Sequence, residues 1–272
     1  MPIDDLTGVR SLPVAVLCDL DGVVWLSHHP IAGSVEAIAA LRAADHRVLF
    51  VTNNSFSLVE EQEAALAAIG IPAVGDVLTS ALAAAELVEP GERVHVCGGP
   101  GIVQALERRG AVVVTEGACD AVLVGFHRSF DYEGLRRAAT AVIAGARLIG
   151  TNDDATYPTP DGPIPGGGSL LAAVATASGA SPVIAGKPYA PMAALVRAVL
   201  GVADQPGVTD AVMVGDRPST DGRFARALGC PFALVWSGVT AAGTVVEPVP
   251  DLVAANLAAI AAQLLAREDQ GH

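Results

Sequence analysis

The stretch "LPVAVLCDLDGVVW", residues 12–25, places two acids at the end of an apolar run. The run from Val14 to Leu17 predicts a buried strand. Asp19 and Asp21 then stand two residues apart, where apolar residues would continue a strand, and Gly22 follows at once. Taken alone, such an acid is as typical of a turn or helix cap as of a functional site. The stretch becomes informative only if other strands end in the same way.

The composition indicates a buried sheet covered by helices. The chain has 272 residues, enough for one large domain or two modest ones with a proper core. Hydrophobic residues make up 51 % of it and aromatic residues only 4 %, so Ala, Val, Leu and Ile must build the core. This composition suits helices that pack on a sheet buried on both faces.

The charge and the cysteines exclude several classes of protein. A net charge of −13 repels nucleic acid and anionic membranes, so we expect neither as a partner. No apolar run is long enough for a membrane span, and the acidic start "MPIDDLTGVR" lacks the apolar core of a secretion signal. The four cysteines are scattered without zinc-like spacing. We therefore expect a cytoplasmic protein.

Short apolar runs alternate with Ala-rich helical stretches along the whole chain. This alternation predicts an α/β fold with a mostly parallel sheet covered by helices on both faces. Near the C-terminus we expect a helix over Thr220–Leu228 and a closing helix over Leu252–Arg267. The apolar runs between about Ser80 and Pro182 end in Gly or His and suggest a separate insertion.

Four of the predicted strands end in polar or charged residues, and the first of them ends in Asp19 and Asp21. The run at 47–54 ends in Thr52, Asn53 and Asn54, "PVIAG" ends in Lys187, and "AVMVG" ends in Asp216, with Asp221 five residues on. Ligands of parallel α/β sheets bind at the carboxyl ends of the strands, so these groups are expected to gather. Lys187 is the single Lys beside fifteen Arg, which suggests that its position needs a compact ammonium.

The gathered groups suit phosphoryl transfer. Asp19, Asp21 and Asp216 would repel one another without a hard cation among them, and oxygen-only ligands favour Mg²⁺. Thr52, the amides near it and Lys187 supply donors for a phosphate. One Asp would then be placed to attack phosphorus, and another to carry a proton.

Four motifs occur in a familiar order: "DLDGVVW", "FVTNN", "GKP" and "VGDRPSTD". They resemble the motifs of the haloacid dehalogenase (HAD) superfamily. Together with "TNDDATYPTPDGPIPGGGSLLAA", they are similar to subfamily IIA, the NagD-like and p-nitrophenylphosphatase-like branch. The resemblance implies a Rossmann-like HAD core, a parallel sheet with helices on both faces, and an inserted α/β cap domain of the C2 type. It implies a catalytic core at 1–80 and 183–272 and a cap at 81–182.

The resemblance also implies the roles of the residues. Asp19 would be the nucleophile and Asp21 the acid and base, with alternation returning Asp21 to the side of Asp19. Mg²⁺ would be held by Asp19, by Asp21 through its backbone carbonyl, and by Asp216. The phosphate would be bound by Thr52, Asn53 and Lys187, with Gly22 leaving room for the backbone to approach it. Asp221 would support the metal or Lys187 from outside the ligand set.

Two positions depart from the pattern of the branch. Pro218 and Gly222 stand where bulky apolar residues are usual. Neither change removes a catalytic group. Both lie in the segment that carries Asp216 and Asp221.

The expected function is therefore that of a Mg²⁺-dependent phosphatase acting on small phosphate monoesters through an aspartyl-phosphate. Glycerol phosphates, sugar phosphates, nucleoside monophosphates and pyridoxal phosphate all fit, and a glycerol- or sugar-type phosphate is favoured. The expected partner is a small phosphorylated metabolite, and the resemblance implies a possible homodimer through the cap. Two alternatives stay open: a phosphotransferase that uses the same aspartyl-phosphate, and a non-catalytic protein that binds a phosphorylated metabolite.

Overall fold

The computed structural model describes residues 15–157, 159, 162–205 and 207–269. It divides into two compact units. Of the described residues, the first unit holds those from 15 to 49 and from 207 to 269, and the second holds those from 50 to 205. Val14, the expected first residue of the opening strand, and the acidic N-terminal stretch lie outside the described residues.

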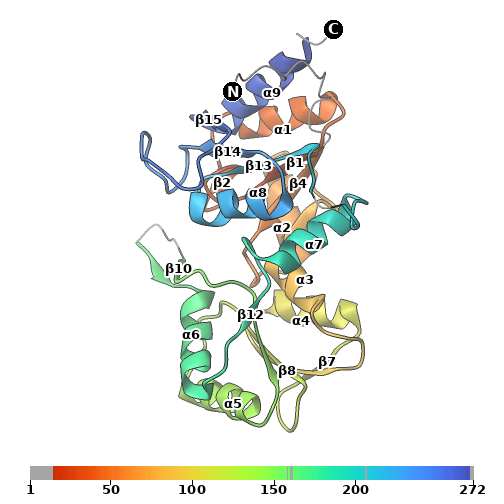
Figure 1. Cartoon of the computed structure of the whole chain (residues 1–272), viewed down its shortest axis with the longest axis vertical. Coiled ribbons are helices and arrows are strands. Elements are labelled where there is room, and N and C mark those ends of the chain that lie inside the picture. Colours follow the sequence, from red (N-terminus) through yellow and green to blue (C-terminus); the bar gives the residue numbers. More distant parts are fainter. Residues whose placement is uncertain (1–14, 158, 160–161, 206, 270–272) are drawn as a thin grey trace, which may run out of the picture. The chain divides into compact units, whose positions relative to one another are not determined.

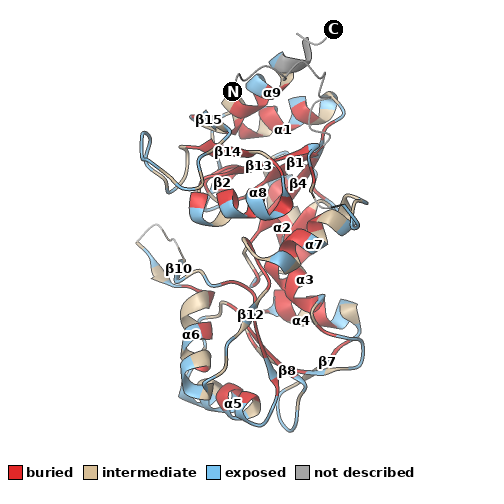
Figure 2. Cartoon of the chain, viewed as in Figure 1, coloured by how far each residue is buried: buried red, intermediate tan, exposed pale blue. Residues whose placement is uncertain are grey.

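The strands of the first unit form a parallel sheet of order β15-β14-β13-β1-β4. All residues of β1, β13 and β14 are buried, as expected for a sheet covered on both faces (Figure 2). Strand β4 crosses the boundary between the units, and within the second unit its residues 50–52 pair in parallel with β5. The strands are β1 Ala15–Cys18, β4 Arg47–Thr52, β5 Val77–Thr79, β13 Ala211–Gly215, β14 Phe232–Val235 and β15 Leu252–Ala254.

Helices flank this sheet (Figure 1). Helices α1 and α9 pack on each other, and α9 also contacts β14 and β15, while α8 contacts β13. A short hairpin, β2–β3, follows β1. The elements are β2 Trp25–Leu26, β3 His29–Pro30, α1 Ser34–Ala43, the π-helical turn η1 Pro218–Gly222, α8 Arg223–Leu228 and α9 Leu257–Asp269.

The expected closing helix was wrong at its start. Residues Leu252–Ala254 form strand β15, and the helix begins only at Leu257. The reason is Asp251, whose backbone N–H donates to Phe232 O at 2.8 Å and whose Oδ2 accepts from Phe232 N at 2.8 Å. These bonds hold the following residues beside β14. The helix expected from Thr220 likewise begins as a π-helical turn and becomes α-helical at Arg223.

The second unit is built on a five-stranded parallel sheet of order β12-β9-β8-β6-β7. An antiparallel hairpin, β10–β11, follows β9. The strands are β6 Arg93–Cys97, β7 Val112–Val114, β8 Ala121–Val124, β9 Arg147–Gly150, β10 Thr156–Tyr157, β11 Ile164–Pro165 and β12 Val183–Ile184.

Helices α5 and α6 pack together against this sheet, around a core that includes Val122, Val124 and Leu171. Helix α3 packs against both α4 and α7. The starts of α3 and α5 are capped by side chains: Thr79 accepts from Leu82 N and Asp131 from Gly134 N. The helices are α2 Val59–Ala68, α3 Ser80–Ala85, α4 Pro100–Arg109, α5 Tyr132–Ile143, α6 Gly167–Ser178 and α7 Ala190–Val199.

The α/β class with parallel sheets flanked by helices is thus confirmed. None of the helices in the described part of the chain is both long and apolar enough to cross a membrane. The division into a catalytic core and a cap at residues 80/81 and 182/183 is a functional assignment and stays a prediction.

Leu171 tests the packing of the second unit. Its side chain is 3 % exposed and fills the space left by Gly150, where a Cβ would overlap it. We expect Leu171→Ala to lower the free energy of unfolding by about 2–5 kcal/mol in chemical denaturation. Ile143→Ala serves as control, because Ile143 is 68 % exposed and its truncation should cost less than about 0.5 kcal/mol. Equal effects of the two changes would contradict the described core.

Candidate active site

The carboxyl ends of β1 and β13 lie side by side. Cys18 pairs with Val214, and the N–H of Asp19 donates to Val214 O at 2.9 Å. In a parallel pair the residues that follow the two strands emerge at the same edge. Asp19 and Asp216 therefore become neighbours although they stand far apart in the sequence.

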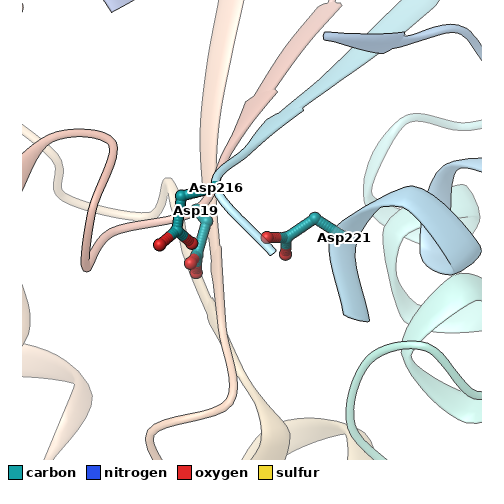
Figure 3. A group of neighbouring side chains, drawn as sticks. All are labelled: Asp19, Asp216 and Asp221. Atoms are coloured by element: carbon teal, nitrogen blue, oxygen red, sulfur yellow. The ribbon is translucent and has the colours of Figure 1, made fainter. Parts of the chain in front are cut away.

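Three carboxylates meet at this edge (Figure 3). One oxygen each from Asp19, Asp216 and Asp221 lies within 4.8 Å of the others. Asp216 is 3 % exposed and Asp221 is 1 % exposed, whereas Asp19 is half-buried. Asp221 reaches the group from the π-helical turn η1. Its carboxylate thus stands with the expected metal ligands, and its assignment to a supporting role stays a prediction.

The loop after β14 fixes Asp216. The N–H of Val239 donates to Asp216 Oδ2 at 2.7 Å, and Thr240 Oγ1 donates to Asp216 O at 2.5 Å. Ser237 Oγ donates to Gly22 O at 2.7 Å, which joins the loops after β1 and β14. Sequence reasoning missed this loop. The signal was available, because "SGVT" follows a buried strand just as the acids do.

Two glycines allow these loops to approach Asp216. A Cβ at Gly22 or at Gly238 would overlap the Asp216 carboxyl group. Gly22 also has φ of +85°, a left-handed conformation that favours glycine. The glycine after the two acids is therefore required by Asp216, whatever further part it plays toward a phosphate.

The turn η1 explains the two departures from the family pattern. Pro218 begins the turn, where its fixed φ is tolerated and no N–H is needed. A Cβ on Gly222 would lie 2.9 Å from Pro248 Cγ and 3.0 Å from Phe232 Cε1, so a bulky residue has no room there. The N–H of Arg217 donates to Asp221 Oδ2 at 3.1 Å and orients that carboxylate.

Asp21 lies in a tight turn rather than in a strand. Strand β1 ends at Cys18, and Asp21 forms an isolated bridge with Trp25, while Gly22 N donates to Trp25 O at 2.8 Å. Two-residue alternation therefore does not determine its direction. Its carboxylate is not part of the group of three. The roles predicted for it, proton transfer and a backbone ligand to the metal, stay predictions.

The group of three carboxylates suits a hard divalent cation. At 4 Å and an effective dielectric constant of 20, two like charges repel by about 4 kcal/mol. Two of these carboxylates are almost fully buried, so water cannot screen that repulsion well. Oxygen ligands without His or Cys are typical of Mg²⁺ and Ca²⁺. The donor set therefore fits the cation that the sequence predicted.

Three of the predicted phosphate-binding residues, Thr52, Asn53 and Lys187, lie in the second unit, whereas Gly22 lies in the first. Thr52 is buried, and its Oγ1 accepts from Asn54 N at 3.1 Å. The Asn53 side chain meets the backbone of Lys187: Nδ2 donates to Lys187 O at 3.0 Å and Oδ1 accepts from Lys187 N at 2.8 Å. Asn53 and Lys187 are thus brought together across 134 residues.

Further polar residues around Asn53 were missed by sequence reasoning. Its carbonyl accepts from Ser80 Oγ at 2.8 Å and from Asn152 Nδ2 at 2.9 Å. Its Nδ2 also donates to Asp154 Oδ2 at 3.0 Å. Asn152 and Asp154 follow strand β9 and lie in the stretch "TNDDATYPTPDGPIPGGGSLLAA", which was quoted for the family resemblance without a role for either residue. A search of every strand end in that insertion would have found them.

The structure therefore holds two groups of predicted site residues, one in each compact unit. The first contains Asp19, Asp216 and Asp221, with Gly22 against Asp216. The second contains Thr52, Asn53 and Lys187. That both groups serve one reaction centre stays a prediction.

Two of the four cysteines are poor nucleophiles. Burial raises the pKa of the Cys97 thiol to about 11 and that of Cys230 to about 12. Both thiols are therefore protonated near neutral pH, and the thiolate is the reactive form. The described carboxylates are better candidates for covalent chemistry than these thiols.

Comparison with known proteins identifies the family. Residues 16–112 match the model of haloacid dehalogenase-like hydrolases, and residues 184–260 match a second, HAD-hydrolase-like model. The chain belongs to the HAD-like hydrolases. Its structure resembles the p-nitrophenyl phosphatase of Archaeoglobus fulgidus with a TM-score of 0.87 and 27 % identity, over 93 % of this chain and 100 % of that one. The predicted superfamily, branch and HAD fold are confirmed.

Two similar proteins of Mycobacterium tuberculosis are named for an activity. The chain is 39 % identical over 243 residues to a D-glycerol 3-phosphate phosphatase, and the match spans 86 % of this chain but 66 % of that relative. It also resembles a glycerol phosphate phosphatase solved with magnesium, with a TM-score of 0.79 and 35 % identity over 89 % of this chain and 74 % of that one.

Gly238 tests the geometry of the carboxylate group. We expect Gly238→Ala to displace Asp216 and to weaken Mg²⁺ binding by about tenfold or more in isothermal titration calorimetry, because a Cβ would overlap that carboxyl group. Gly207→Ala is the control, since a Cβ there meets its nearest neighbour only at 3.4 Å. Unchanged Mg²⁺ affinity in Gly238→Ala would contradict the described packing around Asp216.

Proposed function

We propose that this protein is a Mg²⁺-dependent phosphatase of small phosphate monoesters that works through an aspartyl-phosphate on Asp19. The group of three carboxylates carries the proposal: Asp19 follows β1, Asp216 follows β13, and Asp221 lies in η1. The chain belongs to a hydrolase family, and the relatives named above are phosphatases. The binding of magnesium by one relative supports the choice of cation.

In the proposed reaction, an oxygen of Asp19 attacks the phosphorus and the ester oxygen leaves. Asp21, protonated at that moment, gives its proton to the leaving oxygen. Asp21 then takes a proton from water, and the hydroxide attacks the phosphorus of the aspartyl-phosphate. Inorganic phosphate leaves, and the Asp19 carboxylate is restored. Each covalent bond formed to phosphorus is thereby matched by one that breaks.

The remaining residues are proposed to balance charge. Asp19, the Asp21 carbonyl and Asp216 would hold Mg²⁺, and the cation would reduce the negative charge on the phosphate oxygens when bound. Asp221 would support this set. Lys187 and Thr52 would donate to the phosphate, and the backbone of Asn53 and Gly22 would approach it.

We propose a small phosphorylated metabolite as substrate and favour glycerol- and sugar-type phosphates. The name of the 39 % identical relative supports glycerol phosphate as the first ester to test. The cap at 81–182 would limit the size of the substrate. A cytoplasmic location and a homodimer through the cap are retained as predictions.

Phosphate release from a panel of small phosphomonoesters tests the proposal. We expect wild-type protein to release phosphate with Mg²⁺ and not with EDTA. Asp19→Asn should lower kcat by about 10³-fold or more, because an amide is a poor nucleophile. Asp45→Asn is the matched control: Asp45 is exposed at φ of +61°, a conformation that Asn also tolerates.

The same panel separates the alternatives. Substrate consumption without free phosphate, dependent on an added alcohol, would favour a phosphotransferase. Tight binding of an ester without turnover would favour a binding protein. Full activity of Asp19→Asn would contradict the proposed nucleophile.

A further inference from the structure

The side-chain amide of Asn53 holds both backbone polar groups of Lys187. Its Nδ2 donates to Lys187 O at 3.0 Å, and its Oδ1 accepts from Lys187 N at 2.8 Å. One rigid planar group therefore fixes both ends of a single residue, as a paired strand residue would. The side chain of Lys187 is 1 % exposed, so it starts from a fixed backbone in a packed environment.

The carboxylate of Asp154 and the N–H of Lys187 both require the same direction of that amide. Asn53 Nδ2 donates to Asp154 Oδ2 at 3.0 Å. A carboxylate only accepts hydrogen bonds, so the nitrogen of the amide, and not its oxygen, must face Asp154. With the nitrogen there, the oxygen is turned toward the N–H of Lys187.

The two N–H groups of Asn53 Nδ2 are both used in this arrangement. One donates to Lys187 O and the other to Asp154 Oδ2. An amide nitrogen has two hydrogens, and phosphate oxygens require a donor. The side chain of Asn53 has therefore no donor left for a phosphate, and a phosphate contact from this residue would have to come from its backbone.

The surroundings are shaped to admit this clamp. A Cβ on Gly186 would crowd Asn53 Oδ1 and Thr151 O, so glycine is needed just before the lysine. Ser80 and Asn152 hold the carbonyl of Asn53 at 2.8 Å and 2.9 Å. Asn53 is thus placed by partners other than Lys187, and it can transmit that placement to the lysine.

We propose that Asn53 and Asp154 are positioning residues for Lys187: Asn53 clamps the backbone of the lysine, and Asp154 orients the clamp. The inference rests on the proposed function, in which the Lys187 ammonium meets the phosphate. Neither side chain touches substrate. Both act by keeping the ammonium where the transferring phosphoryl group needs it.

The first test compares neighbouring acids. Asp154→Ala should lower kcat for the preferred ester by about tenfold or more, because small misplacements of a binding group are costly. Asp154→Asn retains an acceptor for Asn53 Nδ2 and should stay within about threefold of wild type. Asp153→Ala is the matched control, because Asp153 Oδ2 accepts from Tyr189 OH at 2.5 Å, whereas the bond from Asn53 Nδ2 goes to Asp154. Loss of the Asp153 carboxylate should therefore change kcat by less than about twofold.

The second test exchanges the two partners. Asn53→Asp replaces Nδ2 with an oxygen that faces two acceptors, and it should lower kcat by about 10²-fold. Adding Asp154→Asn supplies a side-chain N–H at position 154 that can donate to the new carboxylate at position 53. The double variant has the same net charge as wild type. The double variant should recover about tenfold or more of the lost kcat. If the Asn53 side chain bound phosphate directly, the second change would recover nothing.

Binding of inorganic phosphate separates this inference from the proposed function. In the presence of Mg²⁺, Asp154→Ala should weaken phosphate affinity by about fivefold or more in calorimetry, and Asp154→Asn should not. If wild type bound phosphate with these differences but hydrolysed no ester, the phosphatase would fail and the positioning role would stand. Wild-type kcat and phosphate affinity in Asp154→Ala, with its fold intact by circular dichroism, would overturn the positioning role alone. A wild-type protein that neither hydrolysed esters nor bound phosphate would overturn both.

Discussion

The repulsion among three converging carboxylates is the constraint on which the first unit depends. Asp216 and Asp221 are almost fully buried, and each has an oxygen within 4.8 Å of Asp19. Buried like charges need hydrogen bonds and a counter-charge. The backbone supplies part of this through Val239 N and Arg217 N. The proposed divalent cation would supply further counter-charge. Packing and glycines fix the loops that present these acids.

Much of this arrangement could be predicted from the order of strand ends. Parallel strands deliver the residues that follow them to one edge, so the apolar runs that precede Asp19 and Asp216 are enough to predict that these acids meet, and the register of β1 and β13 brings them together. The same argument does not predict the position of the Asp21 carboxylate, because β1 ends at Cys18 and the chain then turns. Nor does it reach Asp221, whose place depends on a π-helical turn that no periodicity in the sequence indicates.

The parts that escaped prediction are those decided by partners distant in the sequence. Leu252–Ala254 has the apolar character of a helix or a strand, and the bonds of Asp251 to Phe232 decide for a strand. Gly238 looks like an ordinary turn residue until the Asp216 carboxyl group is placed against it. Asn53 was expected at the phosphate because the family resemblance implies that role, and its side-chain amide offers donors. Whether those donors are available depends on Asp154 and Lys187, which lie 101 and 134 residues away.

These contacts give a physical reason why position 187 is a lysine and not an arginine. The chain uses Arg at every other basic position, so its lysine at 187 is not explained by a need for surface charge. The residue before it is Gly186, where a Cβ would overlap Asn53 Oδ1 and Thr151 O. Lys187 itself is buried, and its backbone is hydrogen-bonded to the Asn53 side chain. A guanidinium is broader and needs five donors satisfied, whereas an ammonium is compact and needs three. A site that fixes the backbone so tightly leaves the side chain little freedom to adjust, which favours the smaller cation.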